Sequence, residues 1–159
     1  MAGITIRVLV ADDFEPFRRL VSSTLQKQPQ LQLADEALDG AEAVQKAQEL
    51  KADIILLDVN LPKLNGFEVA RRLREHVPQL KIIFFSADRS FDLAGEALRM
   101  GAYGYLVKSD AATELVPALE AVFEGKRYVS SSVVRRVSRT LTRAPFESCA
   151  LPREAHERG

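Results

Sequence analysis

The sequence DIILLDVNLPKLNG at residues 53–66 contains four consecutive aliphatic residues that run directly into a carboxylate, Asp58. An apolar run without alternation predicts a strand that is buried on both faces, as in a parallel sheet. Asp58 then lies where the strand ends and a loop with a proline and a glycine begins. Because ligands bind beyond the carboxyl ends of strands in open α/β sheets, we expect Asp58 to act as a nucleophile or a metal ligand.

Similar apolar segments alternate with helical patterns along most of the chain. Strands are expected over residues 4–11, 31–37, 53–58, 81–86 and 103–107. Helices are expected over residues 15–27, 41–50, 67–76, 90–100 and 113–124. This alternation predicts an α/β fold with a parallel sheet and helices on both faces. Right-handed crossovers favour a five-stranded doubly wound, flavodoxin-like sheet of order 2-1-3-4-5. The weaker, alternating segment 31–37 is expected at or near a sheet edge.

Composition narrows the functional classes. The chain has 159 residues, of which 47% are hydrophobic, so it suits one domain with an appendage. Its 22 basic and 22 acidic side chains cancel, so no overall charge draws it to nucleic acid or to an anionic membrane. The single cysteine, Cys149, has no internal disulfide partner, which favours a reducing cytosol. Without a signal-peptide pattern or a spanning apolar stretch, we expect a soluble, cytoplasmic protein.

Four of the predicted strands end in residues that can do chemistry. These residues are Asp12 and Asp13, Asp58, Ser86, and Lys108. The predicted strand order brings them to one edge of the sheet, where three clustered carboxylates repel one another and need a cation. Oxygen ligands suit Mg²⁺ or Mn²⁺ rather than zinc. Lys108 and Ser86 then supply a positive charge and a hydroxyl that can hold a dianionic group.

This combination favours transfer of a phosphoryl group to Asp58, since the cation and the lysine offset the repulsion between nucleophile and phosphoryl group. Taken singly, each residue has a plainer interpretation. Asp13 can be a helix cap, Ser86 a turn residue and Lys108 a solvated charge. The joint arrangement at four strand ends favours the chemical interpretation. An acyl phosphate on Asp58 would act as a charge switch that draws Ser86 and its loop inward.

At these positions the chain resembles the receiver domain of bacterial two-component response regulators. Asp12-Asp13 is similar to the family's acidic pair, and residues 58–66 to its phosphoacceptor loop, with proline four and glycine eight positions after the aspartate. Ser86-Ala87 resembles the Thr/Ser-Ala step, and residues 101–108 the segment that reaches the family lysine. The resemblance covers about residues 5–125. Serine after Lys108 is similar to the subfamily that carries a helix-turn-helix output domain.

The resemblance implies a role for each site residue. Asp58 would accept phosphate from a phosphohistidine on a sensor histidine kinase. Asp13 would bind Mg²⁺ directly and Asp12 through water, and the backbone carbonyl of Asn60 would complete the metal site with Asp58.

For the phosphoryl group, the resemblance implies that Lys108 pairs with it and that Ser86 donates a hydrogen bond to it. Tyr105 would be the aromatic switch residue that turns inward when Ser86 moves. Spacing alone leaves open that Tyr105 is an edge-strand aromatic packed on a helix.

After the receiver-like region, residues 1–125, the composition changes. Residues 126–144 contain six basic side chains and no acidic one, with an apolar stripe at helical spacing, which predicts an amphipathic basic linker or tail helix. It is either a linker helix or a surface that pairs with a partner, such as a second copy on phosphorylation; contact with nucleic acid is a weaker alternative. Residues 145–159 are expected to be disordered. No complete output domain follows, so it is either removed or naturally absent.

Three functions from different classes remain. The favoured one is a phosphorylation-activated, non-enzymatic switch that regulates transcription through a missing or separate DNA-binding domain. The second is a Mg²⁺-dependent phosphohydrolase with an aspartyl-phosphate intermediate, although Asn60 stands where such an enzyme would want a second aspartate. The third is a single-domain receiver that acts by protein–protein binding without phosphate.

Overall fold

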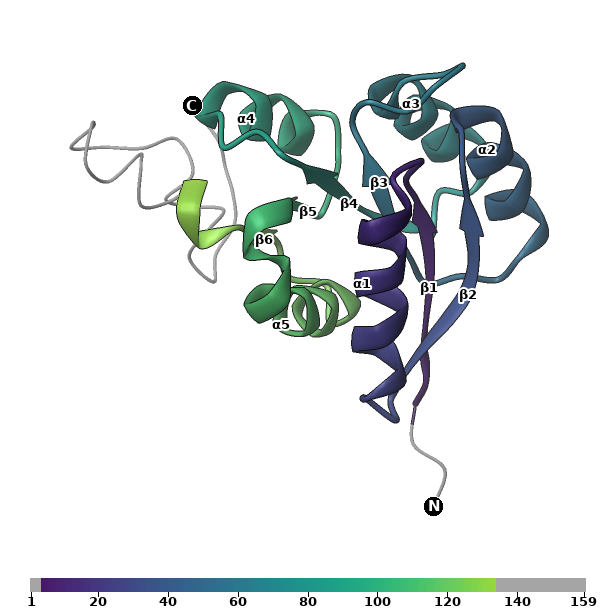
Figure 1. Cartoon of the computed structure of the whole chain (residues 1–159). Coiled ribbons are helices and arrows are strands. Elements are labelled where there is room, and N and C mark those ends of the chain that lie inside the picture. Colours follow the sequence, from purple (N-terminus) through teal and green to yellow (C-terminus); the bar gives the residue numbers. More distant parts are fainter. Residues whose placement is uncertain (1–3, 134–159) are drawn as a thin grey trace.

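The computed structural model describes residues 4–133, which form one sheet flanked by helices (Figure 1). The strands are β1 (Ile6–Ala11), β2 (Leu31–Ala37), β3 (Ile54–Asp58), β4 (Lys81–Ser86), β5 (Gly104–Val107) and β6 (Tyr128–Val129). The helices are α1 (Glu15–Gln26), α2 (Gly40–Glu49), α3 (Gly66–His76), α4 (Phe91–Arg99) and α5 (Ala111–Phe123), with a 3₁₀ turn, η1 (Lys108–Asp110), before α5. All strand pairs are parallel, in the order β2-β1-β3-β4-β5-β6.

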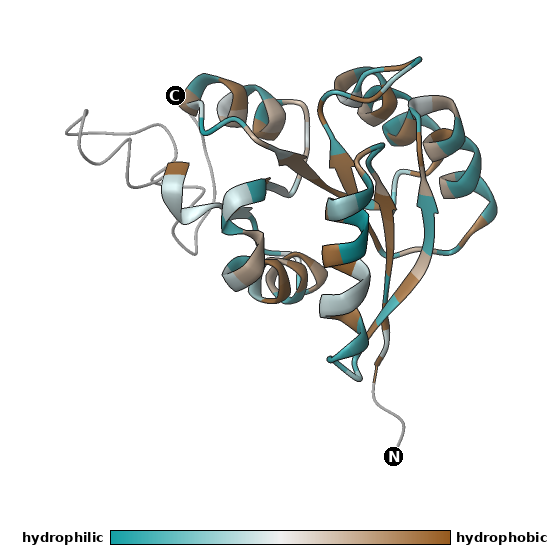
Figure 2. Cartoon of the chain, viewed as in Figure 1, coloured by the Kyte–Doolittle hydropathy of each residue, from teal (hydrophilic) through white to brown (hydrophobic). Residues whose placement is uncertain are grey.

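The sheet separates two hydrophobic clusters, because successive side chains of a strand point to opposite faces. Leu57 and its same-face neighbours pack with α2, α3 and α4, whereas Leu56 and its neighbours pack with α1 and α5. All five residues of β3 are buried, as expected for a central parallel strand. Figure 2 shows this as apolar central strands between helices of mixed character. Among residues 4–133, no helix combines the length and the apolar character that a membrane span requires.

The predicted α/β fold class and the order 2-1-3-4-5 are confirmed. β2, predicted at or near an edge, is the edge strand next to β1, and its register with β1 shifts between Val8 and Leu9. The predicted number of strands was one too low, because the short strand β6 pairs with the free side of β5. A strand of two residues has too few side chains to carry a period-2 signal, so the pattern did not reveal it.

The tail helix predicted from residue 126 is wrong over its first residues. Tyr128 and Val129 are extended, and helical structure begins only at Ser131. The reason is that the backbone here is satisfied by β5: the N–H of Tyr128 donates to the carbonyl of Tyr103 (3.0 Å), and that of Ser130 to the carbonyl of Tyr105 (2.9 Å). The rest of the predicted tail helix, and the predicted disorder over 145–159, lie outside the described residues.

Side chains also attach this segment, residues 128–133, to the domain. The hydroxyl of Tyr128 donates to Glu114 on α5 (2.9 Å), and the hydroxyl of Ser132 donates to Asp110 (2.7 Å). The buried Oγ of Ser130 accepts a hydrogen bond from the N–H of Val107 (2.8 Å), the last residue of β5. Val133 is fully buried in the cluster that contains α4. These contacts attach residues 128–133 to β5, the strand that precedes Lys108, and to α5.

Candidate functional site

Three carboxylates meet where β1 and β3 end. Asp12 and Asp13 follow β1, and Asp58 is the last residue of β3. The pairing of Ala11 with Leu57 in the sheet brings the next residue of each strand into the same neighbourhood. One oxygen from each of the three carboxylates lies within 4.8 Å of the others. Asp12 and Asp58 are buried, whereas Asp13 is exposed. The sequence prediction that these acids share one edge of the sheet thus agrees with the structure.

Two of these carboxylates are held by backbone N–H groups two residues further along the chain. Asp12 Oδ1 accepts a hydrogen bond from the N–H of Phe14 (2.9 Å), and Asp58 Oδ1 accepts one from the N–H of Asn60 (3.0 Å). This is the local turn that aspartate favours. Each carboxylate is therefore oriented by one oxygen and keeps its second oxygen, Oδ2, for other partners.

Lys108 lies between these two second oxygens. Its Nζ is 2.7 Å from Asp12 Oδ2 and 3.4 Å from Asp58 Oδ2, and its side chain is only 10% exposed. Lys108 begins η1, directly after β5, so its ammonium group reaches the site from the strand beyond β4. An ion pair this deeply enclosed is screened little by water. The single positive charge of Lys108 therefore offsets part of the negative charge of two buried acids.

The protonation of Asp58 reflects its surroundings. Burial raises the pKa of the Asp58 carboxyl, and the nearby charge of Asp12 acts in the same direction. The N–H of Asn60 and the ammonium group of Lys108 oppose this rise without cancelling it. The charged form of Asp58 is therefore less favourable here than it is in water. A cation bound beside a carboxylate in such surroundings would stabilise its charged form strongly.

The donor set fits a hard divalent cation. Asp12 Oδ2 is buried and, within the described residues, makes no hydrogen bond of normal geometry, although Lys108 Nζ is close. The clustered ligand atoms are all carboxylate oxygens, and the backbone of the exposed Asn60 lies next to them through its N–H contact with Asp58. Oxygen donors of this kind are typical of Mg²⁺ sites.

Gly66 determines the course of the loop that follows Asp58. Its N–H donates to the carbonyl of Val59 (2.8 Å), which folds the loop back on the strand end. A Cβ atom on Gly66 would lie 2.4 Å from the carbonyl oxygen of Asp58 and 2.8 Å from Val59 Cα. Only a residue without a side chain permits this approach of two backbones. Asn65 then caps α3 by accepting the N–H of Glu68 (2.9 Å).

Ser86 and Tyr105 meet at the loop after β4. Ser86 is buried at the end of β4, and its Oγ accepts the N–H of Asp88 (3.0 Å). The hydroxyl of Tyr105 donates to the carbonyl of Asp88 (2.7 Å), and burial raises the pKa of Tyr105 to about 12. Tyr105 is fully buried on the α4 side of the sheet. The sequence left open that Tyr105 is an aromatic residue on an edge strand. Its strand, β5, is not at the edge, because β6 pairs with it, and Tyr105 packs in the core.

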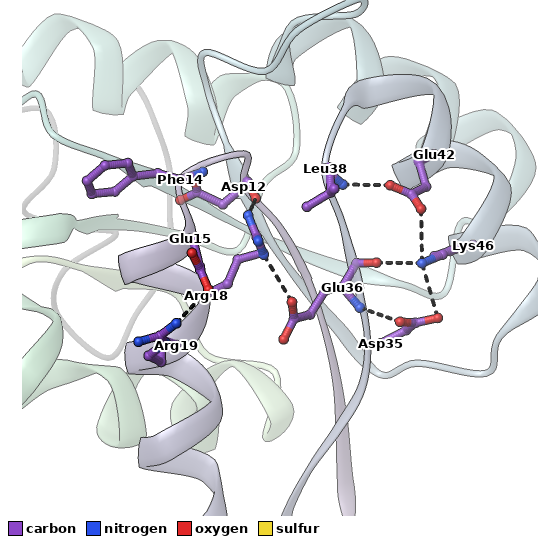
Figure 3. A network of polar contacts seen from close by, with 10 residues as sticks. All are labelled: Asp12, Phe14, Glu15, Arg18, Arg19, Asp35, Glu36, Leu38, Glu42 and Lys46. Carbon is purple, nitrogen blue, oxygen red and sulfur yellow. Dashed lines mark hydrogen bonds and ion pairs between the residues drawn. The ribbon is translucent and has the colours of Figure 1, made fainter.

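A polar network supports the Asp12 corner from the β2 side (Figure 3). Arg18 on α1 donates to the backbone carbonyl of Asp12 (3.0 Å) and pairs with Glu36 on β2 (3.0 Å). Lys46 on α2 contacts the Glu36 carbonyl (2.6 Å) and Asp35 (3.3 Å). No local sequence pattern predicts this network, because its members come from α1, β2 and α2 and meet only in the folded chain.

The aromatic surroundings of Lys108 were also not predicted. The ring centroids of Phe17 on α1 and Phe85 on β4 lie 4.6 Å and 5.5 Å from Lys108 Nζ. No local pattern relates Phe17 to Lys108, which lies 91 positions further on. The feature that does so is tertiary: α1 packs against the sheet face from which Phe85 points.

Several known proteins resemble this chain. The response regulator GacA of Pseudomonas viridiflava is 34% identical over 133 residues, which are 84% of this chain and 62% of GacA. The transcriptional regulatory protein DegU of Brevibacillus brevis is 31% identical over 83% of this chain and 56% of its own length. The chain therefore spans only about three-fifths of the length of these curated relatives.

Solved structures agree with the sequence relatives. A LuxR-family two-component response regulator from Aurantimonas sp. SI85-9A1 superposes with a TM-score of 0.79 at 30% identity, covering 85% of this chain and 96% of that one. The receiver domain of the putative response regulator NarL from Mycobacterium tuberculosis gives a TM-score of 0.74 at 31% identity, over 78% of this chain and 100% of that one. Residues 8–120 match the response regulator receiver domain family. With its acidic pocket of Asp12, Asp13 and Asp58 beside Lys108, the chain belongs to the family of receiver domains of two-component response regulators rather than to a family of enzymes.

Proposed function

We propose that this chain is a phosphorylation-driven switch in which Asp58 accepts a phosphoryl group from a phosphohistidine of a sensor histidine kinase. The observation that carries the proposal is the convergence of three carboxylates and the ammonium group of Lys108 at one strand edge. Asp58 is buried, and Asn60, whose N–H donates to Asp58, lines an open recess of about 410 Å³ together with Ser86, Asp88 and others. A phosphoryl donor approaches Asp58 through such an opening.

The proposed transfer is a simple displacement at phosphorus. A carboxylate oxygen of Asp58 forms the new P–O bond while the P–N bond to the donor imidazole breaks, and the imidazole nitrogen takes up a proton. Lys108 holds its positive charge toward the phosphoryl oxygens, and the Ser86 hydroxyl turns from the Asp88 N–H to donate to one of them. Asp13, Asp58 and the Asn60 carbonyl would hold a Mg²⁺ ion, with Asp12 acting through water, and the ion would supply the remaining charge neutralisation when bound.

The signal then passes through Ser86 and Tyr105. Both are bonded to the backbone of Asp88, so a movement of Ser86 toward the new anion changes the loop to which the Tyr105 hydroxyl is attached. Tyr105 lies on β5, and its backbone carbonyl accepts the N–H of Ser130 in the segment 128–133. The proposed route of the signal therefore leads from Asp58 through Tyr105 to residues 128–133, which follow the receiver domain (residues 1–125).

The output of the switch lies outside the receiver domain. The relatives' names and lengths support output through a DNA-binding domain beyond the matched region, with regulation of transcription as the result. The chain would form a homodimer on phosphorylation and would contact DNA only through that output domain. A donor histidine kinase is expected to meet it in the cytoplasm. Dimerisation predicts a rise in sedimentation coefficient after phosphorylation, and a monomer in both states would contradict it.

The other two functions differ in testable ways. A phosphohydrolase would consume many phosphate equivalents per chain, and Asn60 stands where its acid/base aspartate would be needed. A binding module that ignores phosphate would take up none. Asn60 at that position favours the switch over the hydrolase, and the intact acidic pocket and Lys108 favour it over the binding module.

Phosphate uptake tests the proposal directly. The full chain is incubated with Mg²⁺ and acetyl phosphate, and its intact mass is compared with that of Asp58→Asn. We expect one added phosphate on the wild type, none on the variant, and strong suppression by EDTA or by Asp13→Asn. Uptake on the variant, or none on the wild type, would refute the assignment of Asp58. Release of many phosphates per chain from a specific metabolite would instead support the hydrolase.

A further inference from the structure

We propose that Phe17 is a positioning residue for Lys108: its ring holds the ammonium group over the phosphoryl site when the carboxylates are engaged elsewhere. This inference rests on the proposed function, because it assigns Phe17 a part in phosphoryl transfer to Asp58. Phe17 lies on α1, one turn after the acidic pair, and is half-buried.

The geometry around Lys108 has two parts. Its Nζ lies 2.7 Å and 3.4 Å from oxygens of Asp12 and Asp58. The same atom lies over the ring of Phe17, with the centroid 4.6 Å away, and 5.5 Å from the Phe85 centroid. The two rings contact each other edge to face, with centroids 5.7 Å apart and an interplanar angle of 74°. The ammonium group is thus close both to two carboxylates and to two aromatic rings.

The rings matter because the carboxylates are shared. A cation bound by Asp13 and Asp58 would neutralise much of the negative charge that attracts Lys108. The cation itself would also repel the ammonium group. The face of an aromatic ring is attractive to an ammonium ion and is not consumed by metal binding. Phe17 is the nearer of the two rings and therefore provides most of this second attraction. A leucine at this position would fill similar space without a π-face.

The plainer alternative is that Phe17 only packs. It does belong to the cluster on the α1 and α5 side of the sheet, and its ring also contacts Phe14, with centroids 5.5 Å apart. Packing predicts a loss of stability when Phe17 is shortened, but no dependence of that loss on Lys108. Positioning predicts that the effect of Phe17 on phosphoryl transfer disappears when the lysine is absent.

A double-mutant cycle separates these roles. Initial rates of Asp58 phosphorylation by acetyl phosphate at fixed Mg²⁺ are measured for wild type, Phe17→Leu, Lys108→Ala and the double variant of the full chain. We expect Phe17→Leu to slow the reaction roughly 3- to 30-fold, which at ~1.36 kcal/mol per tenfold corresponds to about 0.7–2 kcal/mol. We expect no further slowing by Phe17→Leu in the Lys108→Ala background.

Two further variants serve as controls. Phe17→Tyr keeps the ring and is expected to restore the rate to within about twofold of wild type. Phe123→Leu shortens another half-buried phenylalanine of the same cluster, at the end of α5. The carbonyl of Phe123 accepts a hydrogen bond from Lys81, the first residue of β4, at the opposite end of that strand from Ser86. Phe123→Leu is expected to lower the free energy of unfolding as Phe17→Leu does, without slowing phosphorylation.

The position of the Lys108 side chain can also be measured without phosphate. In NMR spectra of the metal-loaded protein, the ε-methylene protons of Lys108 are expected at high field because of the Phe17 ring. They are expected to move downfield in Phe17→Leu and to stay in Phe17→Tyr. Unchanged lysine resonances, an unchanged rate, or equal slowing with and without Lys108 would each overturn the proposal. A wild type that takes up no phosphate would refute the proposed function, while the lysine resonances would still decide where Phe17 holds the ammonium group.

Discussion

Replacing Ser130 with alanine tests the attachment of the segment 128–133 to the sheet. The Oγ of Ser130 accepts the N–H of Val107 at 2.8 Å, and both residues are fully buried. In Ser130→Ala this N–H loses its acceptor, and the nearby carbonyl of residue 130 already accepts the N–H of Val133 (3.1 Å). The substitution therefore removes one partner and leaves the other buried.

The expected loss follows from that asymmetry. A buried donor left unsatisfied costs about 1–3 kcal/mol, more than the net value of an ordinary hydrogen bond. Alanine removes only one oxygen, so the cavity that it leaves is small and contributes little. We expect Ser130→Ala to lower the free energy of unfolding by about 1–3 kcal/mol, a considerable part of the ~5–15 kcal/mol typical of a domain.

Urea unfolding of the full chain measures the global loss, and hydrogen exchange at the Val107 amide measures the local one. Ser23→Ala on the exposed side of α1 is the matched control, since the same atom is removed where water replaces it; its effect should stay within about 0.5 kcal/mol. If the two variants are equally stable, or if Val107 exchanges as slowly in Ser130→Ala as in the wild type, the segment does not anchor β5 in this way.

Two further substitutions probe the site itself. Because burial raises the pKa of Asp58, the charged carboxylate opposes folding above that raised pKa, so in EDTA Asp58→Asn should be more stable than wild type at pH 7. Urea titrations should show this advantage shrinking as the pH falls through the raised pKa and disappearing below the ordinary value of 3.8; an advantage that grows toward low pH would contradict it. Gly66→Ala should cost about 1–3 kcal/mol and slow phosphate uptake, because its Cβ would meet the Asp58 carbonyl oxygen at 2.4 Å. Gly125→Ala, which has a φ of +90° but nothing within 4 Å of its Cβ, should lose stability without slowing uptake, and equal slowing in both would point to a general effect of strain.

The agreement between sequence and structure is closest where local pattern and topology act together. The run before Asp58 carries its own burial signal, and parallel pairing brings the ends of neighbouring strands to one edge. The juxtaposition of Asp12, Asp13, Asp58 and Lys108 therefore follows from element order and the rule for crossovers. The spacing of Gly66 from Asp58 was part of the family resemblance, and the structure supplies its reason, since the loop passes close to the strand end there.

What the sequence alone determined is thus the order of the first five strands, the strand that ends in Asp58, and the types of side chain gathered beside it, because burial and periodicity are properties of short stretches. Only the tertiary structure decided that Tyr128 and Val129 close the edge of β5 rather than begin a helix, since a two-residue strand exists only where a neighbouring strand offers free N–H and C=O groups. The tertiary structure also placed the ring of Phe17 against Lys108. A contact between residues so far apart depends on how a helix docks on a sheet, and no local pattern encodes that docking.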